Sequence, residues 1–226
     1  MDIIKQIQDI ALFRGVSAEN LKLLASQAIY KKFKSGDLVI GETDQIRSFY
    51  VVIAGQLKLY KSSAEGREQT LSLLSPGDPF GLCTAFATDS FPASAMAIEE
   101  SSVLIIPGEL MEAIAKKEPT LLLNIIQILS QRLKDAMTLI ESLALKEIPE
   151  RLSAFLLHAL SKDADEKKNK LELTISHREL SKILGSTPEA LSRALRKMSN
   201  DRILVVEGRT ITILDRQALE ELAQGE

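Results

Sequence analysis

The chain has no tryptophan, a single cysteine, Cys83, and only two histidines, His158 and His177. One cysteine excludes an internal disulfide and any cysteine-only metal or iron–sulfur site within one chain. Two histidines leave too few ligands for a histidine-based zinc site, so no metal site is expected. His158 lies in the apolar run FLLHAL, and the sequence pairs it with no nucleophile or carboxylate. We therefore predict no catalytic residues and no enzymatic activity.

Long apolar runs are missing as well. No segment approaches the ~20 residues of a membrane span, and the acidic start MDIIKQIQDI does not resemble a signal peptide. A cytoplasmic protein with no membrane partner is therefore expected. The net charge of −3 argues against a chain that is basic throughout, but it leaves room for a local basic surface.

The pattern of residues divides the chain into three parts. From Tyr30 to Pro107, short β-rich segments alternate with Gly, Pro and Asp turns, which predicts a compact β domain over residues 1–117. Apolar residues then recur at alternating steps of four and three, which predicts a long helix over 118–147 with a coiled-coil seam. A parallel homodimer would bury this seam, and packing against the chain's own β domain is the alternative. The seam residues are Leu122, Ile126, Leu129, Leu133, Ala136, Ile140 and Leu143.

Pro149 interrupts this pattern. The residue before a proline is disfavoured in the helical conformation, so Ile148–Pro149 is predicted to be a boundary or hinge. Residues 148–226 then show a helix, the helix HRELSKIL, a glycine turn, a second helix and the strand pair LVVEGRTITIL. This order is typical of a winged helix-turn-helix. The predicted fold class is α+β, with a compact β sandwich or barrel, a long helix and a C-terminal winged helix-turn-helix.

The second helix of that motif comes from the segment GSTPEALSRALRKM, residues 185–198. Thr187 suits the N-cap, and Pro188 suits the first helical position because its missing N–H would be unpaired there anyway. The polar face carries Glu189, Ser192, Arg193 and Arg196. Arginine matches the O6 and N7 acceptors of guanine, and glutamate matches the N4 donor of cytosine. An ordinary solvated helix is the alternative, but six basic against three acidic residues over 177–202 favour DNA binding.

Two signatures then give the chain a family resemblance: FYVVIAGQLKLYKSSAEGREQTLSLLSPGDPFG over 49–81, and ISHRELSKILGSTPEALSRALRKM over 175–198. Over nearly its whole length the chain resembles the CRP/FNR family of transcription regulators. The resemblance implies an N-terminal β-roll of the cyclic-nucleotide-binding type, a long dimerisation helix and a C-terminal winged helix-turn-helix. The resemblance implies a homodimer that binds a palindromic operator in double-stranded DNA, with RNA polymerase as a further partner. It implies base contacts from Glu189, Ser192 and Arg193. Phosphate contacts would come from Ser176, His177 and Arg178.

The resemblance also bears on the branch and the effector. Pro188 stands where the cyclic-AMP-responsive branch has arginine, which favours the FNR-like branch and TTG…CAA half-sites. Cyclic-nucleotide binders carry a Gly-Glu-Leu segment and an Arg–Ser/Thr pair. This chain has Leu82 in place of the glutamate, and Pro92 and Ala93 near the pair. A buried phosphate without a cation costs on the order of several kcal/mol, so cyclic AMP is not expected to bind.

The run GLCTAF…FPASA resembles the subgroup that controls hybrid-cluster-protein genes under nitrosative stress. Haem responding to nitric oxide or carbon monoxide is one hypothesis for the effector, with Cys83, Met96, the N-terminal amine or a tyrosine as axial ligand. A ligand-binding regulatory module that acts through protein contacts is the alternative function. The predicted pocket, for which a filled β-roll core is the alternative, is lined by Phe80, Gly81, Leu82, Cys83, Phe86, Phe91, Ser94, Met96, Leu129, Leu133 and Met137.

Overall fold

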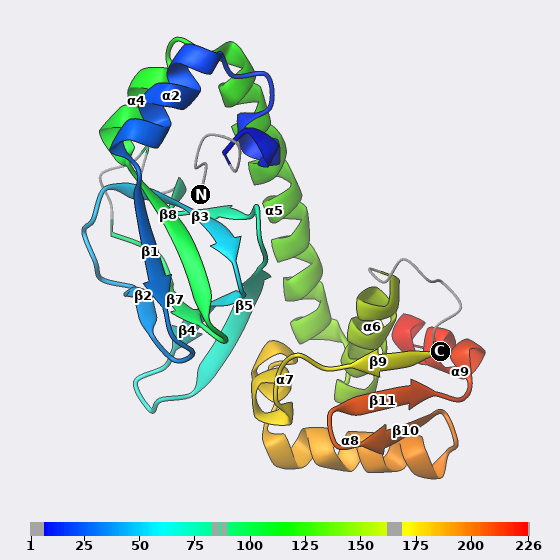
Figure 1. The fold of residues 1–226 in the computed structure, drawn as a ribbon. Helices are drawn as coiled ribbons and strands as arrows, with labels where there is room; N and C mark the ends of the chain where they lie inside the picture. The colour runs from blue at the N-terminus through cyan, green and yellow to red at the C-terminus, as the bar shows by residue number, and fades with distance from the viewer. Residues whose placement is uncertain (1–6, 83–85, 87–89, 162–168, 226) are drawn as a thin grey trace. The chain divides into compact units, whose positions relative to one another are not determined.

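The computed structural model describes residues 7–82, 86, 90–161 and 169–225 (Figure 1). Contacts group the chain into two compact units, residues 1–135 and 136–226. The division falls within one helix, α5 (Pro119–Leu145), so each unit is described separately.

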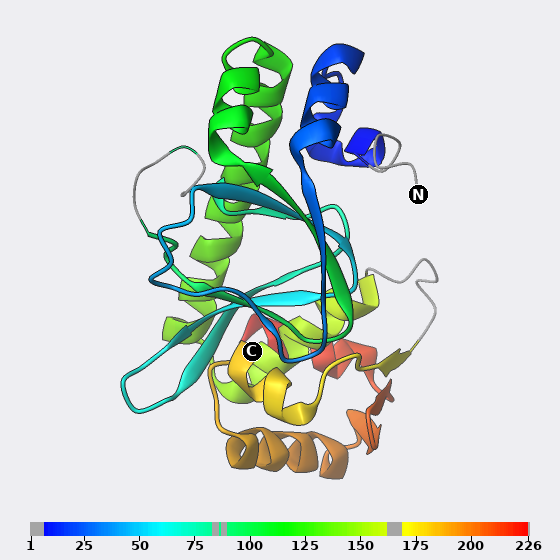
Figure 2. The ribbon, with the colours of Figure 1, turned by 60° about the vertical axis from the view of Figure 1, so that its left-hand side comes forward.

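Two four-stranded antiparallel sheets form the N-terminal unit, and Figure 2 shows the roll that they make. The first has the order β1 (Ile29–Phe33), β8 (Ser101–Pro107), β3 (Ser48–Ala54) and β6 (Pro79–Phe80). The second has the order β2 (Leu38–Ile40), β7 (Ser94–Ala97), β4 (Leu57–Ser62) and β5 (Glu68–Leu74). The predicted β-roll is therefore confirmed.

Strand β3 shows why the core divides into two clusters. Its side chains alternate between the faces of the sheet. Phe49 and Val51 pack toward the helices, whereas Tyr50 and Val52 pack between the two sheets. A strand buried on both faces reads as a continuous apolar run, as FYVV does. Each large apolar side chain that is fully buried contributes about 1.5–3 kcal/mol to stability.

Short helices cover the outer face of the first sheet: η1 (Ala11–Phe13), α2 (Ala18–Gln27), α4 (Gly108–Ala115) and the first turns of α5. The Glu118 carboxylate accepts hydrogen bonds from the backbone N–H of Ser17 at 3.1 Å and from the Asn20 amide at 2.6 Å. The Ser17 hydroxyl donates a third hydrogen bond to this carboxylate. Together the three bonds lower the pKa of Glu118, and the Ser17 hydroxyl contributes most. The start of α2 is thereby tied to the start of α5.

Helix α5 has two apolar faces. Leu121 and Ile125 are buried in the cluster against the first sheet. The other face stays open in the single chain, where Ile126, Leu133 and Ile140 are 57%, 64% and 66% exposed. The helix therefore packs on its own β domain with one stripe and leaves the predicted heptad stripe free.

The helical conformation is interrupted at residues 146–147, between α5 and α6 (Ile148–Ser161). Helix α6 begins one residue before Pro149, so the proline occupies the first turn. There its missing N–H disrupts no intrahelical bond. The helix boundary expected near Pro149 is present, and the proline lies in the first turn of the helix that follows.

The C-terminal unit contains α6, α7 (His177–Ile183), α8 (Pro188–Asn200) and α9 (Arg216–Gln224). Its antiparallel sheet has the order β10 (Leu204–Glu207), β11 (Thr210–Ile213) and β9 (Lys170–Glu172). The core includes Leu156, Leu180, Leu191 and Ile211, all at most 1% exposed. This arrangement confirms the winged helix-turn-helix. Across the described ranges, no helix is both long and apolar enough to cross a membrane.

Candidate nucleic-acid interface

Helix α8 presents the polar face expected from the sequence. The Thr187 hydroxyl accepts a hydrogen bond from the Ala190 N–H at 3.2 Å, and Pro188 takes the first helical position. One face of the helix is buried, by Leu191, Ala194, Leu195 and Met198. The residues on the other face are exposed: Glu189, Ser192, Arg193, Arg196 and Lys197. We call this second set the α8 polar face.

The turn before α8 fixes where that face points. The Ser176 hydroxyl caps α7 by accepting from the Glu179 N–H at 3.2 Å. Gly185 then takes a φ of 59°, in the left-handed region that glycine adopts without strain. The Ser186 N–H donates to the Ser181 carbonyl at 2.9 Å and closes the turn. Two capped helices joined through this glycine form the helix-turn-helix.

The residues at the start of α7 differ in their exposure. The Arg178 side chain is exposed, whereas His177 is half-buried. His177 Nε2 is buried and has no hydrogen-bond partner among the described residues. The Arg178 side chain is therefore accessible from solvent, whereas the Nε2 atom of His177 is not. The phosphate contacts assigned to Ser176, His177 and Arg178 stay predictions.

Glu189 is prepared to act as an acceptor. The pKa of its carboxyl is lowered, first by a hydrogen bond from its own backbone N–H and then by one from the Thr187 hydroxyl. The positive charge of Arg193 lowers this pKa further. The side chain is consequently ionised at neutral pH, as an acceptor from cytosine N4 must be.

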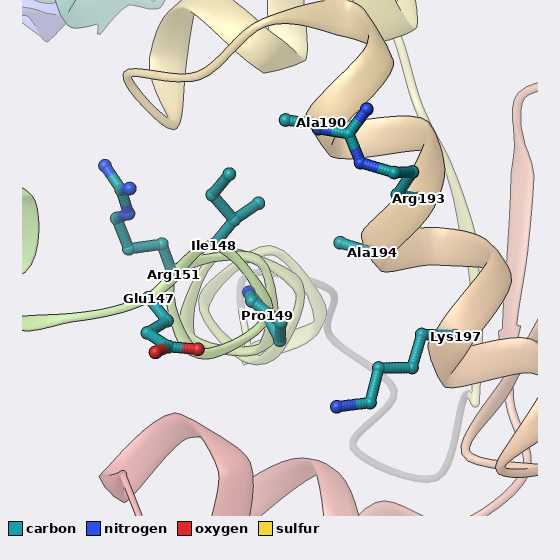
Figure 3. Close-up of a pocket in the computed structure, with 8 residues that line it drawn as sticks. All are labelled: Glu147, Ile148, Pro149, Arg151, Ala190, Arg193, Ala194 and Lys197. Atoms are coloured by element: carbon teal, nitrogen blue, oxygen red, sulfur yellow. The ribbon is translucent and has the colours of Figure 1, made fainter.

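A groove of 470 Å³ borders the α8 polar face within the C-terminal unit (Figure 3). One wall is the start of α6, with Glu147, Ile148, Pro149 and Arg151. The other wall is α8, with Ala190, Arg193, Ala194 and Lys197. Three cations and one carboxylate line the groove, and Arg193 and Lys197 belong to both surfaces. The sequence pattern did not predict the groove because its two walls lie some forty residues apart in the chain.

The structure does not bring the predicted effector-pocket residues together. Phe80 and Phe91 lie between the two sheets, where Phe80 stacks on Tyr50 at 4.8 Å between ring centroids. Leu82 instead joins the cluster against the helices. Phe86 is exposed, and Leu129, Leu133 and Met137 lie on the exposed stripe of α5. Cys83 lies outside the described residues.

Two further residues of the predicted pocket do not face the space between the sheets, because side chains alternate along a strand. Ala95 and Ala97 pack between the sheets, so Ser94 and Met96 lie on the opposite face of β7. The backbone at residue 81 itself explains why this residue is a glycine. At a φ of +79°, a Cβ there would lie 2.7 Å from Tyr50 Cδ2 and 2.8 Å from the Ser48 carbonyl oxygen. The aromatic side chains thus fill the core between the sheets, in line with the alternative given above.

Met96 and Tyr50 do not fit the role of a haem axial ligand. Met96 faces away from the space between the sheets. Tyr50 is 2% exposed and stacked on Phe80, and burial raises the pKa of its phenol, which opposes a phenolate ligand. Of the ligands expected from the sequence, Cys83 and the N-terminal amine lie outside the described residues.

A β-roll, a long helix and a winged helix-turn-helix with an exposed polar recognition helix define the class of effector-linked DNA-binding regulators. Residues 30–118 match the family model of the cyclic nucleotide-binding domain, and residues 150–222 match that of the Crp-like helix-turn-helix domain. The chain belongs to the CRP/FNR family of transcription regulators.

Individual relatives agree with this assignment. The chain is 32% identical to the fumarate and nitrate reduction regulatory protein of Vibrio cholerae over 85% of its own length and 78% of the relative's. It is 27% identical to the cyclic AMP receptor protein of Thermus thermophilus, over 95% and 97% of the two chains. The structure of FixK2 from Bradyrhizobium japonicum has a TM-score of 0.75 and 28% identity, covering 86% and 96% of the two chains. These relatives are regulators, as predicted, and not enzymes.

Proposed function

We propose that the chain is a homodimeric regulator that binds a palindromic operator. In this proposal residues 1–117 sense an effector, residues 118–147 form the dimerisation helix and residues 148–226 bind DNA. One observation carries the DNA-binding role: a capped, proline-led helix exposes Glu189, Ser192 and Arg193 on one face. In a helix-turn-helix, such side chains near the start of the second helix reach base edges in the major groove.

The groove beside α8 supports a second part of the proposal. Arg193 and Lys197 line its α8 wall, and the first turn of α6 forms the other wall. We assign this groove to the sugar–phosphate backbone that borders the major groove. Cations there supply affinity that does not depend on sequence, while Glu189 and Arg193 supply base preference.

The free stripe of α5 supports the homodimer. Its residues are spaced as in a two-stranded coiled coil, and most of them are exposed in the single chain. Pairing would place two copies of α8 roughly 34 Å apart, one helical turn of DNA, and this spacing matches palindromic half-sites such as TTG…CAA. RNA polymerase is the proposed partner of the DNA-bound dimer.

Salt dependence tests DNA binding against the alternative of a module that acts through protein contacts. A fluorescent duplex selected by the chain from a random pool is titrated at several salt concentrations. A steep fall in log K with log salt, with a slope near −0.9 per phosphate contacted, is expected for DNA binding. A scrambled duplex that binds equally well, or a flat salt dependence, would contradict the proposal.

We propose an effector other than cyclic AMP. Leu82 occupies the position of the family's glutamate and lies in an apolar cluster, where it cannot hold a ribose hydroxyl. The finer form of the proposal is haem that reports nitric oxide, in the subgroup that controls hybrid-cluster-protein genes. It rests on the resemblance of the run GLCTAF…FPASA. Its ligand would come from outside the described residues, with Cys83 as the first candidate.

Two titrations separate these effectors. Millimolar cyclic AMP is expected to leave the melting temperature unchanged, because Pro92 and Ala93 stand near the position of the family's arginine. Haem is expected to give a saturable Soret shift that Cys83→Ala abolishes. Met96→Leu is the matched control and should keep the shift, since Met96 lies on the opposite face of β7. Tight binding of cyclic AMP would overturn the first expectation, and a featureless haem titration would remove haem.

A further inference from the structure

Two cations flank Pro149, and each bonds the C-terminal end of a different helix of the C-terminal unit. Lys146 Nζ donates to the Ala223 carbonyl at 2.7 Å, in the last turn of α9. Arg151 Nη1 donates to the Leu184 carbonyl at 2.7 Å, at the C-cap of α7. Both bonds are partly buried, and they span 77 and 33 residues of sequence. We call this pair the corner clamp.

The chemistry of helix ends explains why these bonds matter. The last carbonyls of a helix have no intrahelical N–H partner, and they carry the negative end of the helix dipole. A cationic side chain both donates a hydrogen bond to such a carbonyl and offsets the negative end of the helix dipole. Such charge-assisted bonds are shorter and stronger than neutral ones, and partial burial reduces their screening by salt. The corner clamp is therefore more than a pair of solvated surface contacts.

The segment between the two cations is itself closed by hydrogen bonds. The Glu150 carboxylate accepts from the Glu147 N–H at 3.0 Å, which caps the start of α6. The Arg151 N–H donates to the Glu147 carbonyl at 3.0 Å, and the Lys146 N–H donates to the Ser142 carbonyl at 3.2 Å. Pro149 adds a fixed φ in the first helical turn. The backbone between α5 and α6 is therefore held by these three hydrogen bonds and by the proline.

Arg151 also touches the element that sets the recognition helix. Leu184, whose carbonyl it bonds, directly precedes Gly185, the residue of the turn that leads into α8. Displacing the Leu184 carbonyl would tilt α8 relative to α6. The position of the α8 polar face therefore depends on Arg151, which also lines the groove beside α8.

We infer that Lys146 and Arg151 are positioning residues that make the corner part of the DNA-binding unit. Residues 146–226 then move as one body, and any reorientation of α8 pivots N-terminal to Lys146, within α5, and not at Pro149. The consequence for operator choice rests on the proposed function. With the corner locked, α5 sets the separation of the two recognition helices, so the dimer should accept only one spacing of half-sites.

The test uses the full chain with Lys146→Met, Arg151→Met and the double variant. Arg151→Lys keeps a cationic donor and is expected to retain wild-type behaviour. Arg216→Met is the matched control, a cation on α9 that donates a hydrogen bond to Glu220 of the same helix. Affinity is measured for the duplex that the wild-type chain selects, and for versions whose spacer is one base pair longer or shorter.

The wild-type chain is expected to prefer its own spacing by about tenfold or more, on the scale of one mismatched base pair. The double variant should reduce that preference to roughly twofold. Because Arg151 also lines the groove assigned to the DNA backbone, its loss should lower the affinity for every duplex alike, which leaves the ratio between spacings unaffected. A loss of stability alone would weaken binding to all spacings together. An unchanged preference in the double variant would overturn the inference.

Hydrogen exchange of the DNA-free chain gives an independent readout. Amides of residues 146–148, 150–151 and 184–187 are expected to exchange about tenfold faster in the double variant, since a bond lost to solvent lowers the local opening free energy by about 1.4 kcal/mol. Arg216→Met should leave them unchanged. If the wild-type chain selects no duplex, the proposed function fails while this readout still decides the clamp. Unchanged exchange in the double variant would overturn the clamp.

Discussion

Arg193→Ala is expected to weaken binding to the selected duplex by about 1–3 kcal/mol, roughly 5–150-fold, and to relax the base preference at one position of each half-site. The reason is geometric. Arg193 is exposed, lies one helical turn after Glu189 and borders the groove that we assign to the DNA backbone. A bidentate arginine to guanine is the contact that alanine cannot replace. Fluorescence anisotropy with the selected duplex and its single-base variants measures the change.

Two further variants isolate the role of Arg193. Lys197→Ala should weaken binding about equally for all sequences and reduce the salt slope by about one, because Lys197 is assigned to phosphate. Arg216→Ala on α9 should change neither quantity. Circular dichroism checks the fold, which should persist because Arg193 is exposed. An Arg193→Ala protein that keeps the full base preference of the wild-type chain would refute the assignment.

The fold could be predicted closely where local sequence and tertiary structure agree. The run FYVV is buried on both faces of β3, and the Thr187–Pro188 pair starts α8 as its capping chemistry requires. Gly185 marks the turn because its backbone needs a positive φ. In each case a residue's own conformational preference matches its tertiary surroundings.

Helix α9 was not predicted, although its start carries a readable signal. Asp215 caps the helix by accepting a hydrogen bond from the Ala218 N–H at 3.0 Å, and Leu219 is fully buried. The helix has only nine residues, so its apolar positions span fewer than three turns. Its packing against α6, which the sequence pattern does not show, supplies the stability that so short a helix lacks by itself.

The effector pocket stays a prediction, and the sequence could not show how its residues are arranged. Residues 80–96 are close in the sequence, but strand alternation and a change of core cluster separate their side chains. Phe80 packs between the sheets while Leu82, two residues later, packs against the helices. The groove at α8 and the corner clamp show the converse. Their residues lie far apart in the chain, so no spacing rule could bring them together.

Leu133→Asp is expected to convert the dimer into a folded monomer at micromolar concentration. Leu133 is 64% exposed in the single chain, so the change removes little from the chain's own core. In a parallel pair of α5 helices, the two copies of residue 133 would face each other across the seam. Two desolvated carboxylates there would cost at least about 3 kcal/mol, more than roughly a hundredfold in the dimer Kd. Sedimentation velocity over a concentration series measures the change.

Gln127→Asp is the matched control, because it adds the same charge to an exposed position of α5 outside the predicted seam. It should leave the dimer intact. The monomer should then lose affinity for the palindrome but keep the weaker binding of one half-site, because the winged helix-turn-helix packs within its own unit. A Leu133→Asp chain that stays dimeric would place the dimer contact elsewhere. A monomer that still binds the palindrome at full strength would mean that the two recognition helices act independently, so α5 would not set their spacing.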